Sequence, residues 1–123
     1  MLLVLLAAPA FAQPMPVRQF LLRLEPVRKD FSLQNLTADE RRIVAEHLAY
    51  LQSLEAAGKL AMAGQVFDST RGYWGIMILN TPDPAAAAAI LGDDPAVKQK
   101  MLQGEAIPFR TVVPRPQPPA LKN

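Results

Sequence analysis

The sequence predicts a single α+β domain in which a four-stranded antiparallel sheet carries two helices on one face. Three observations lead to this prediction. Apolar and polar residues alternate with the periods of strand, helix, strand, strand, helix and strand, in that order. The chain has 123 residues, which is the size of one domain. Half of its residues are hydrophobic, which argues against a disordered chain.

A strand and a capped helix begin the predicted domain. Residues 17–24 are mostly apolar and predict a buried strand, which closes at Pro26 because proline has no N–H to give to a sheet. Thr37 and Glu40 have the spacing of a capping box, and apolar residues follow at steps of three and four. Gly58 can take the left-handed conformation that commonly ends a helix.

A hairpin follows the helix. Residues 59–67 and 73–79 predict two strands, and the short polar turn of residues 68–72 favours antiparallel pairing between them. Gly64 indicates a bulge or a close approach to the backbone.

Two helical segments are predicted next. Asp83 caps the first one, and alanine, the best helix former, fills most of it up to Gly92. The second segment begins with the Asp-Asp-Pro of residues 93–95, extends to Leu102 and ends at Gly104.

The last predicted strand covers residues 106–113. Pro108 confines it to the edge of the sheet or to a bulge. The proline-rich residues 114–123 are expected to form a disordered tail. The predicted folded domain therefore covers residues 13–113.

The predicted order of elements is the βαββαβ pattern of a ferredoxin-like fold. Its helices cover one face of the sheet and leave the other bare. Segments such as FLL and IMIL carry apolar residues on both faces. Because a bare apolar sheet exceeds the patches that monomers usually expose, we expect two copies to pair through it as a homodimer.

The composition excludes several kinds of site. The sequence has no cysteine and one histidine, which rules out disulfides, thiolate chemistry and a histidine-rich zinc site within one chain. The formal net charge is only +2, with acidic and basic residues interleaved. We therefore expect no nucleic-acid surface, no metal and no cofactor.

The first twelve residues have the features of an export signal. An apolar run precedes the cleavage pattern Ala10-Phe11-Ala12, although no basic residue comes before Arg18. The run is too short to span a bilayer as a helix. We expect a mature chain that begins at Gln13 and a periplasmic or secreted protein without a stable membrane anchor.

The only histidine, His47, lies inside the first helix. It is four residues from both Ile43 and Leu51, so its side chain points the way the apolar stripe points. Imidazole suits general acid–base chemistry at neutral pH. A histidine on an apolar face is more often a core residue that donates to a carbonyl, and this alternative stays open.

Five segments of the chain resemble the YCII-related proteins. They are the helix EHLAYLQSLEAAGKL, the strand AMAGQVFD, the strand GYWGIMIL, the segment DDPAVKQKML and the final IPFR. The resemblance covers residues 17–113 and implies a dimeric α+β barrel of the ferredoxin-like type, with a cleft between helices and sheet. One known member is a dehydrochlorinase that acts on a chlorinated hydroxyhydroquinone, and the fold is similar to that of muconolactone isomerase.

The resemblance also implies a catalytic dyad of His47 and Asp94. An aspartate bonded to one ring nitrogen would fix the tautomer and leave the other nitrogen free for a substrate. Asp94 precedes Pro95 at a helix start, where an N-cap is the alternative role, and Asp68 is an alternative partner for His47. The chain departs from the family pattern in its export signal and in Ala96, where an aromatic residue is usual.

Two functions of different class are therefore predicted. The first is an exported enzyme of the lyase or isomerase type, which uses the dyad to transfer a proton on a small aromatic or enol-type molecule. The second is a non-catalytic ligand-binding or structural homodimer with the same fold. Arg71, Tyr73 and Trp74 are candidates for the mouth of the cleft, with packing as the alternative for Trp74.

Overall fold

The elements of the fold follow one another in the predicted order. A computed structural model describes residues 19–114 of the chain. The elements are β1 (Gln19–Pro26), α1 (Ala38–Ala56), β2 (Leu60–Asp68), β3 (Gly72–Leu79), α2 (Pro84–Asp93), α3 (Pro95–Lys98) and β4 (Leu102–Phe109). The predicted export signal of residues 1–12 and the predicted tail after Pro114 lie outside the described residues. Within residues 19–114, no helix is long and apolar enough to cross a membrane.

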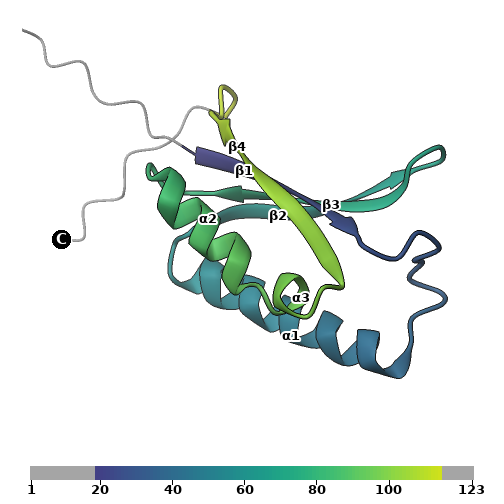
Figure 1. Ribbon diagram of the computed structural model, residues 1–123. Helices are drawn as coiled ribbons and strands as arrows, with labels where there is room; N and C mark the ends of the chain where they lie inside the picture. The colour runs from purple at the N-terminus through teal and green to yellow at the C-terminus, as the bar shows by residue number, and fades with distance from the viewer. Residues whose placement is uncertain (1–18, 115–123) are drawn as a thin grey trace, which may run out of the picture.

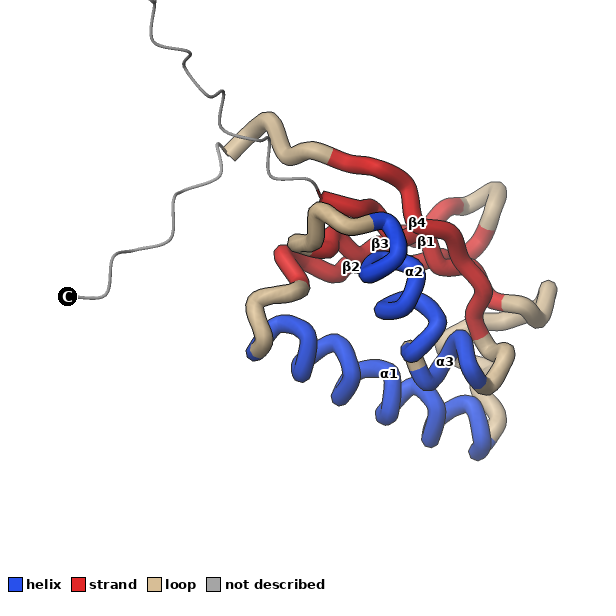
Figure 2. Tube along the Cα trace, turned by 60° about the vertical axis from the view of Figure 1, so that its left-hand side comes forward, coloured by secondary structure: helices blue, strands red, loops and turns tan. Residues whose placement is uncertain are grey.

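The four strands form one antiparallel sheet in the order β2-β3-β1-β4, so β1 and β3 are central. All three helices lie on the same side of this sheet (Figures 1 and 2). This arrangement confirms the predicted α+β fold of the ferredoxin-like type.

Helix α1 begins and ends where the sequence predicts. The Thr37 hydroxyl accepts from the Glu40 amide at 3.1 Å, and the Glu40 carboxylate accepts from the Thr37 amide at 2.9 Å. At the other end, Gly58 has a φ of 73°, and the Lys59 amide donates to the Leu54 carbonyl at 2.8 Å. These bonds satisfy backbone groups that a helix otherwise leaves free at its termini.

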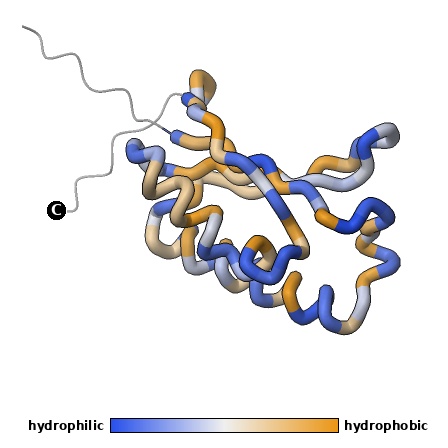
Figure 3. Tube along the Cα trace, viewed as in Figure 1, coloured by the Kyte–Doolittle hydropathy of each residue, from blue (hydrophilic) through white to orange (hydrophobic). Residues whose placement is uncertain are grey.

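The core lies between the helices and the central strands. Large buried side chains of β1 and β3 face small ones on α2 and α3: Leu22, Leu24, Met77, Leu79, Ala87 and Ala96. Figure 3 shows that α2 is hydrophobic along most of its length, whereas the segment between β1 and α1 is mainly hydrophilic. The Tyr50 hydroxyl of α1 donates to the Ile90 carbonyl of α2 at 2.7 Å. Burial raises the pKa of Tyr50 to about 12, so the hydroxyl stays protonated and keeps this bond.

The last part of the domain differs from the prediction. Helix α3 stops at Lys98 and does not extend to Leu102. Lys100 turns the chain with a φ of 58°, so that β4 runs from Leu102 to Phe109 instead of covering residues 106–113. A left-handed turn at a residue other than glycine leaves little trace in a sequence.

Two glycines also have roles other than those predicted. Gly104 lies inside β4 and does not end a helix. The irregularity in β2 falls between Leu60 and Met62, not at Gly64. Pro108 does lie on an edge strand, because β4 pairs with β1 only.

We predict that Gly104→Ala destabilises the protein by roughly 1–3 kcal/mol. A methyl group at Gly104 would overlap the Arg23 carbonyl oxygen and press on the Leu24 side chain, so β1 and β4 would be forced apart. The matched control is Gly92→Ala in α2, where nothing lies within 4 Å. There alanine is expected to stabilise the protein by roughly 0.5–1 kcal/mol. Urea unfolding measures both variants, and equal free energies of unfolding would contradict the close contact of β1 with β4.

Candidate active site

A cavity of about 590 Å³ lies between α1 and the sheet. Helix α2 packs against β4 and β1, which leaves the β2–β3 half of the sheet facing α1 alone. The walls are mostly apolar side chains from α1, from the loop before it, from the sheet and from the turn before β4, including Val44, Leu48, Leu51, Phe31, Phe67 and Met101. A cavity of this size and lining is typical of a small-molecule site.

His47 reaches the cavity from the middle of α1. Ile43 and Leu54, on the same helix, are buried in the core and fix the orientation of α1 over the sheet. The His47 side chain is 18% exposed, so most of the ring is enclosed while part of it meets the cavity. The structure therefore places His47 on the interior side of α1, as the apolar stripe predicts.

Asp94 lies at the junction of α2 and α3 and is the N-cap of α3. Its Oδ1 accepts from the Ala96 amide at 2.9 Å, and Pro95 takes the first helical position. Asp83 caps α2 through the same contact, at 2.9 Å from the Ala85 amide, but Asp83 is exposed. The Asp94 side chain is only 2% exposed. Capping does not require such burial, and we therefore expect the Asp94 carboxylate to have a second hydrogen-bond partner inside the protein.

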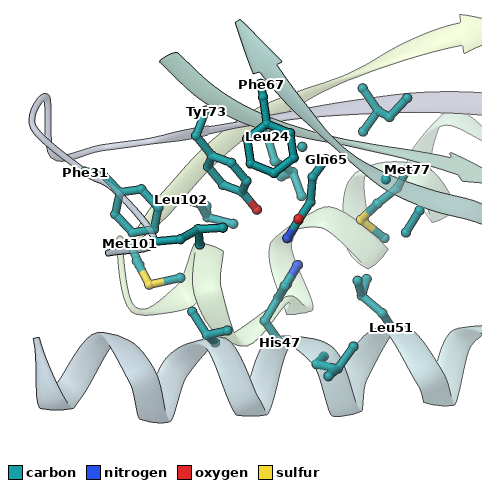
Figure 4. A pocket seen from close by; sticks show the side chains of 17 residues that line it. Leu24, Phe31, His47, Leu51, Gln65, Phe67, Tyr73, Met77, Met101 and Leu102 are labelled. Carbon is teal, nitrogen blue, oxygen red and sulfur yellow. The ribbon is translucent and has the colours of Figure 1, made fainter. Parts of the chain in front are cut away.

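That second contact is with His47. Its Nδ1 lies 2.8 Å from both carboxylate oxygens of Asp94, and the geometry gives the hydrogen bond to Oδ1. Since a carboxylate only accepts, the proton of a neutral imidazole stays on Nδ1 and the lone pair lies on Nε2. Figure 4 shows the free edge of the ring directed into the cavity. Asp94 is thus the cap of α3 and the partner of His47 at the same time.

Asp68, the alternative partner, has a different role. Its Oδ1 accepts from the Thr70 amide at 2.8 Å and from the Arg71 amide at 3.0 Å. These backbone bonds hold the pKa of Asp68 below its usual range. Asp68 therefore closes the turn between β2 and β3, and the structure brings His47 together with Asp94 instead.

Two polar side chains enter the cavity from the sheet, opposite His47. Gln65 of β2 and Tyr73 of β3 direct an amide and a hydroxyl towards the space above the imidazole ring (Figure 4). Burial raises the pKa of Tyr73, while the neighbouring Gln65 side chain acts in the opposite direction. Gln65 is not among the site residues predicted from the sequence. The sequence feature that could have indicated it is the alternation along β2, which puts Gln65 on the same face of the sheet as Ala63 and Phe67.

The other candidates for the cleft mouth lie elsewhere. Arg71 and Trp74 line a separate hollow of about 420 Å³ beyond Tyr73. The Arg23 guanidinium lies 5.0 Å from the centre of the Trp74 ring, so packing accounts for Trp74. Among residues 19–114, no group of three or more His, Cys, Asp or Glu side chains could hold a metal ion.

Comparisons with known proteins identify the family. A search of curated proteins finds no match. Among solved structures, the chain is similar to the 5-chloro-2-hydroxyhydroquinone dehydrochlorinase from Burkholderia phenoliruptrix AC1100 in complex with 2,5-dihydroxybenzoquinone. The identity is 22% and the TM-score 0.54, over 76% of this chain and 92% of that one, which shows a shared fold. The family model of the YCII-related domain matches residues 23–108. The chain therefore belongs to the YCII-related domain family.

Proposed function

We propose that this protein is an enzyme of the lyase or isomerase type that transfers a proton on a small ring-shaped hydroxyl or enol compound. One observation carries the proposal: His47 has its Nδ1 held by the buried Asp94 and its other nitrogen directed into an apolar cavity. That is the arrangement in which an imidazole can act as a general base.

In the proposed reaction, Nε2 of His47 removes a proton from a hydroxyl or carbon of the substrate. The electron pair of the broken bond moves into the ring. In an isomerisation His47 returns the proton to another atom of the ring. In an elimination the ring first takes its keto form, in which the carbon that bears the leaving group also carries a hydrogen; loss of an O–H proton to His47 then moves electrons towards that carbon and expels the leaving group, such as chloride, with its bonding pair. The negative charge of Asp94 stabilises the imidazolium that forms between these steps. Neither course needs an oxidant or a reductant.

The structural neighbour supplies the first compounds to test. Its name states that it removes hydrogen chloride from 5-chloro-2-hydroxyhydroquinone, and it holds 2,5-dihydroxybenzoquinone. Both are single rings with several oxygens, and a cavity of about 590 Å³ has room for a ring of that size.

We predict that His47→Asn lowers turnover by about 10²–10⁴-fold, because the base is removed. The assays are chloride release from 5-chloro-2-hydroxyhydroquinone and the exchange of ring hydrogens of 2-hydroxyhydroquinone in D₂O under argon.

Asp94→Asn keeps an N-cap but removes the charge, and turnover should fall by roughly tenfold or more. Asp83→Asn is its matched control, since Asp83 makes the same cap contact outside the cavity and should leave turnover unchanged.

Two results would count against the enzyme proposal. Turnover by His47→Asn at the wild-type rate would show that another group is the base. Binding of these rings by the wild type without turnover of either would favour the non-catalytic ligand-binding alternative.

We also propose that the protein is a homodimer joined through the bare face of the sheet. A row of apolar side chains crosses all four strands on that face, with Leu21 paired to Ile78 and Ile107, and Ile78 paired to Met62. Its two ends are open to solvent, since Met62 is 46% and Ile107 40% exposed, whereas Ile78 between them is only 5% exposed. A second copy related by a two-fold axis would cover the row with itself.

Light scattering at micromolar concentration is expected to give twice the mass of the chain. Met62→Lys with Ile107→Lys should shift the protein towards monomer, because both ends of the apolar row then carry charge. Val27→Lys is the control, since Val27 is also 46% exposed but lies outside this row. A wild-type monomer would contradict the proposal, and so would equal masses for the double variant and the wild type.

A further inference from the structure

The polar groups of the cavity are few, and they converge. Of the side chains of residues 19–114 that line it, only those of His47, Gln65 and Tyr73 carry hydrogen-bonding groups of ordinary strength, and none is a lysine, arginine, aspartate or glutamate. His47 comes from α1, while Gln65 and Tyr73 come from the neighbouring strands β2 and β3. Figure 4 shows the amide and the hydroxyl on the opposite side of the cavity from the imidazole. A ligand between them would meet hydrogen-bonding groups at two places on its rim.

The floor between these groups is formed by backbone. Gly75 lies directly across from Gln65 in the pairing of β2 with β3, and it lines the cavity. A Cβ at Gly75 would have only ordinary contacts, the nearest at 3.7 Å, so the absence of a side chain is not forced by crowding. The missing side chain leaves room beside Leu24 and Met77, where a ring can lie against the backbone.

The hydrogen-bonding roles of the three groups are complementary. Nε2 of His47 is an acceptor while Asp94 holds the proton on Nδ1, so it requires a donor on the ligand, such as an O–H. Tyr73, like an ordinary tyrosine, is protonated at neutral pH, and burial raises its pKa further, so its hydroxyl can donate to a second oxygen. Gln65 can both donate and accept. Together they fit a ring that carries one hydroxyl and one further oxygen.

Charge restricts the ligand further. A carboxylate or phosphate in the cavity would lie among mostly apolar walls, and among the described residues no lysine or arginine lines the cavity to pair with it. Tyr73 and Gln65 could donate to such an anion, but neither carries a positive charge. The imidazole could supply a positive charge by taking up a proton, which would remove the base, so an anion in this cavity is costly.

We infer that Gln65 and Tyr73 select the substrate, and that the site takes an uncharged ring bearing at least two oxygens and rejects rings that carry a carboxylate. This inference rests on the proposed function, whose base is His47, and names the substrate class of that site. Gln65 and Tyr73 are specificity residues in this account, and His47 remains the group that moves the proton.

The test uses two rings that differ only in a carboxylate, hydroquinone and 2,5-dihydroxybenzoate, titrated into the full-length protein under argon by calorimetry. The wild type is expected to bind hydroquinone at least roughly tenfold more tightly. Gln65→Leu and Tyr73→Phe should each weaken hydroquinone binding by roughly 3–10-fold, the value of one hydrogen bond. Gln65→Arg should reverse the preference, because the guanidinium can pair with the carboxylate. Gln103→Leu, a glutamine on the exposed part of β4 outside this cavity, is the control.

The outcomes separate this inference from the proposed function. Equal affinity of the wild type for the two rings, no binding of either, or a Gln65→Leu variant that behaves like Gln103→Leu would overturn the inference. A clear preference for hydroquinone with no turnover would leave the inference standing and count against the enzyme. Turnover that depends on His47 but not on Gln65 or Tyr73 would support the proposed enzyme and overturn the inference about the substrate class.

Discussion

The hydrogen bond between His47 and Asp94 joins the parts of this structure that matter for function. It links the middle of α1 to the junction of α2 and α3, which are far apart in the sequence. A carboxylate that is almost completely buried is costly unless it is well paired. Asp94 has two partners, the imidazole N–H and the Ala96 amide. Removing either would leave a poorly compensated charge inside the protein, so the contact that orients the imidazole also supports the packing of α3 against α1.

The cavity follows from how three helices share one face of a sheet. The alanine-rich α2 packs on β1 and β4, and its small side chains allow a close approach. Only α1 covers the β2–β3 half, and it does so at one side. The space left between them is bounded by apolar side chains and by the backbone at Gly75. The half of the sheet under α2 is thus closely packed, while the half under α1 has room for a ligand.

Much of this arrangement could be predicted from the sequence. The features that could not be predicted were missed for physical reasons. The capping box at Thr37, the glycine end at Gly58 and the hairpin turn at Asp68 are local signals, and each had the predicted outcome. The end of α3 was missed because Lys100 makes the left-handed turn that glycine usually makes.

The partner of His47 is a question of tertiary contact. Two aspartates fitted the chemistry, and sequence spacing could not choose between them. The family resemblance indicated Asp94, and the structure places it against the ring. Predicting the position of Gln65 requires the strand pairing as well. The alternation along β2 shows which face of the sheet Gln65 lies on, but only the register of β2 against β3 puts it opposite Gly75, above the imidazole.

The protonation state of His47 is the most direct test of this account. The chain has a single histidine, so its ring nitrogens can be observed without assignment by long-range ¹H–¹⁵N correlation NMR. We predict that the neutral ring carries its proton on Nδ1, held by Asp94, and that hydroquinone changes the Nε2 signal much more than the Nδ1 signal. A neutral ring protonated mainly on Nε2 would contradict it, because no lone pair would then face the cavity.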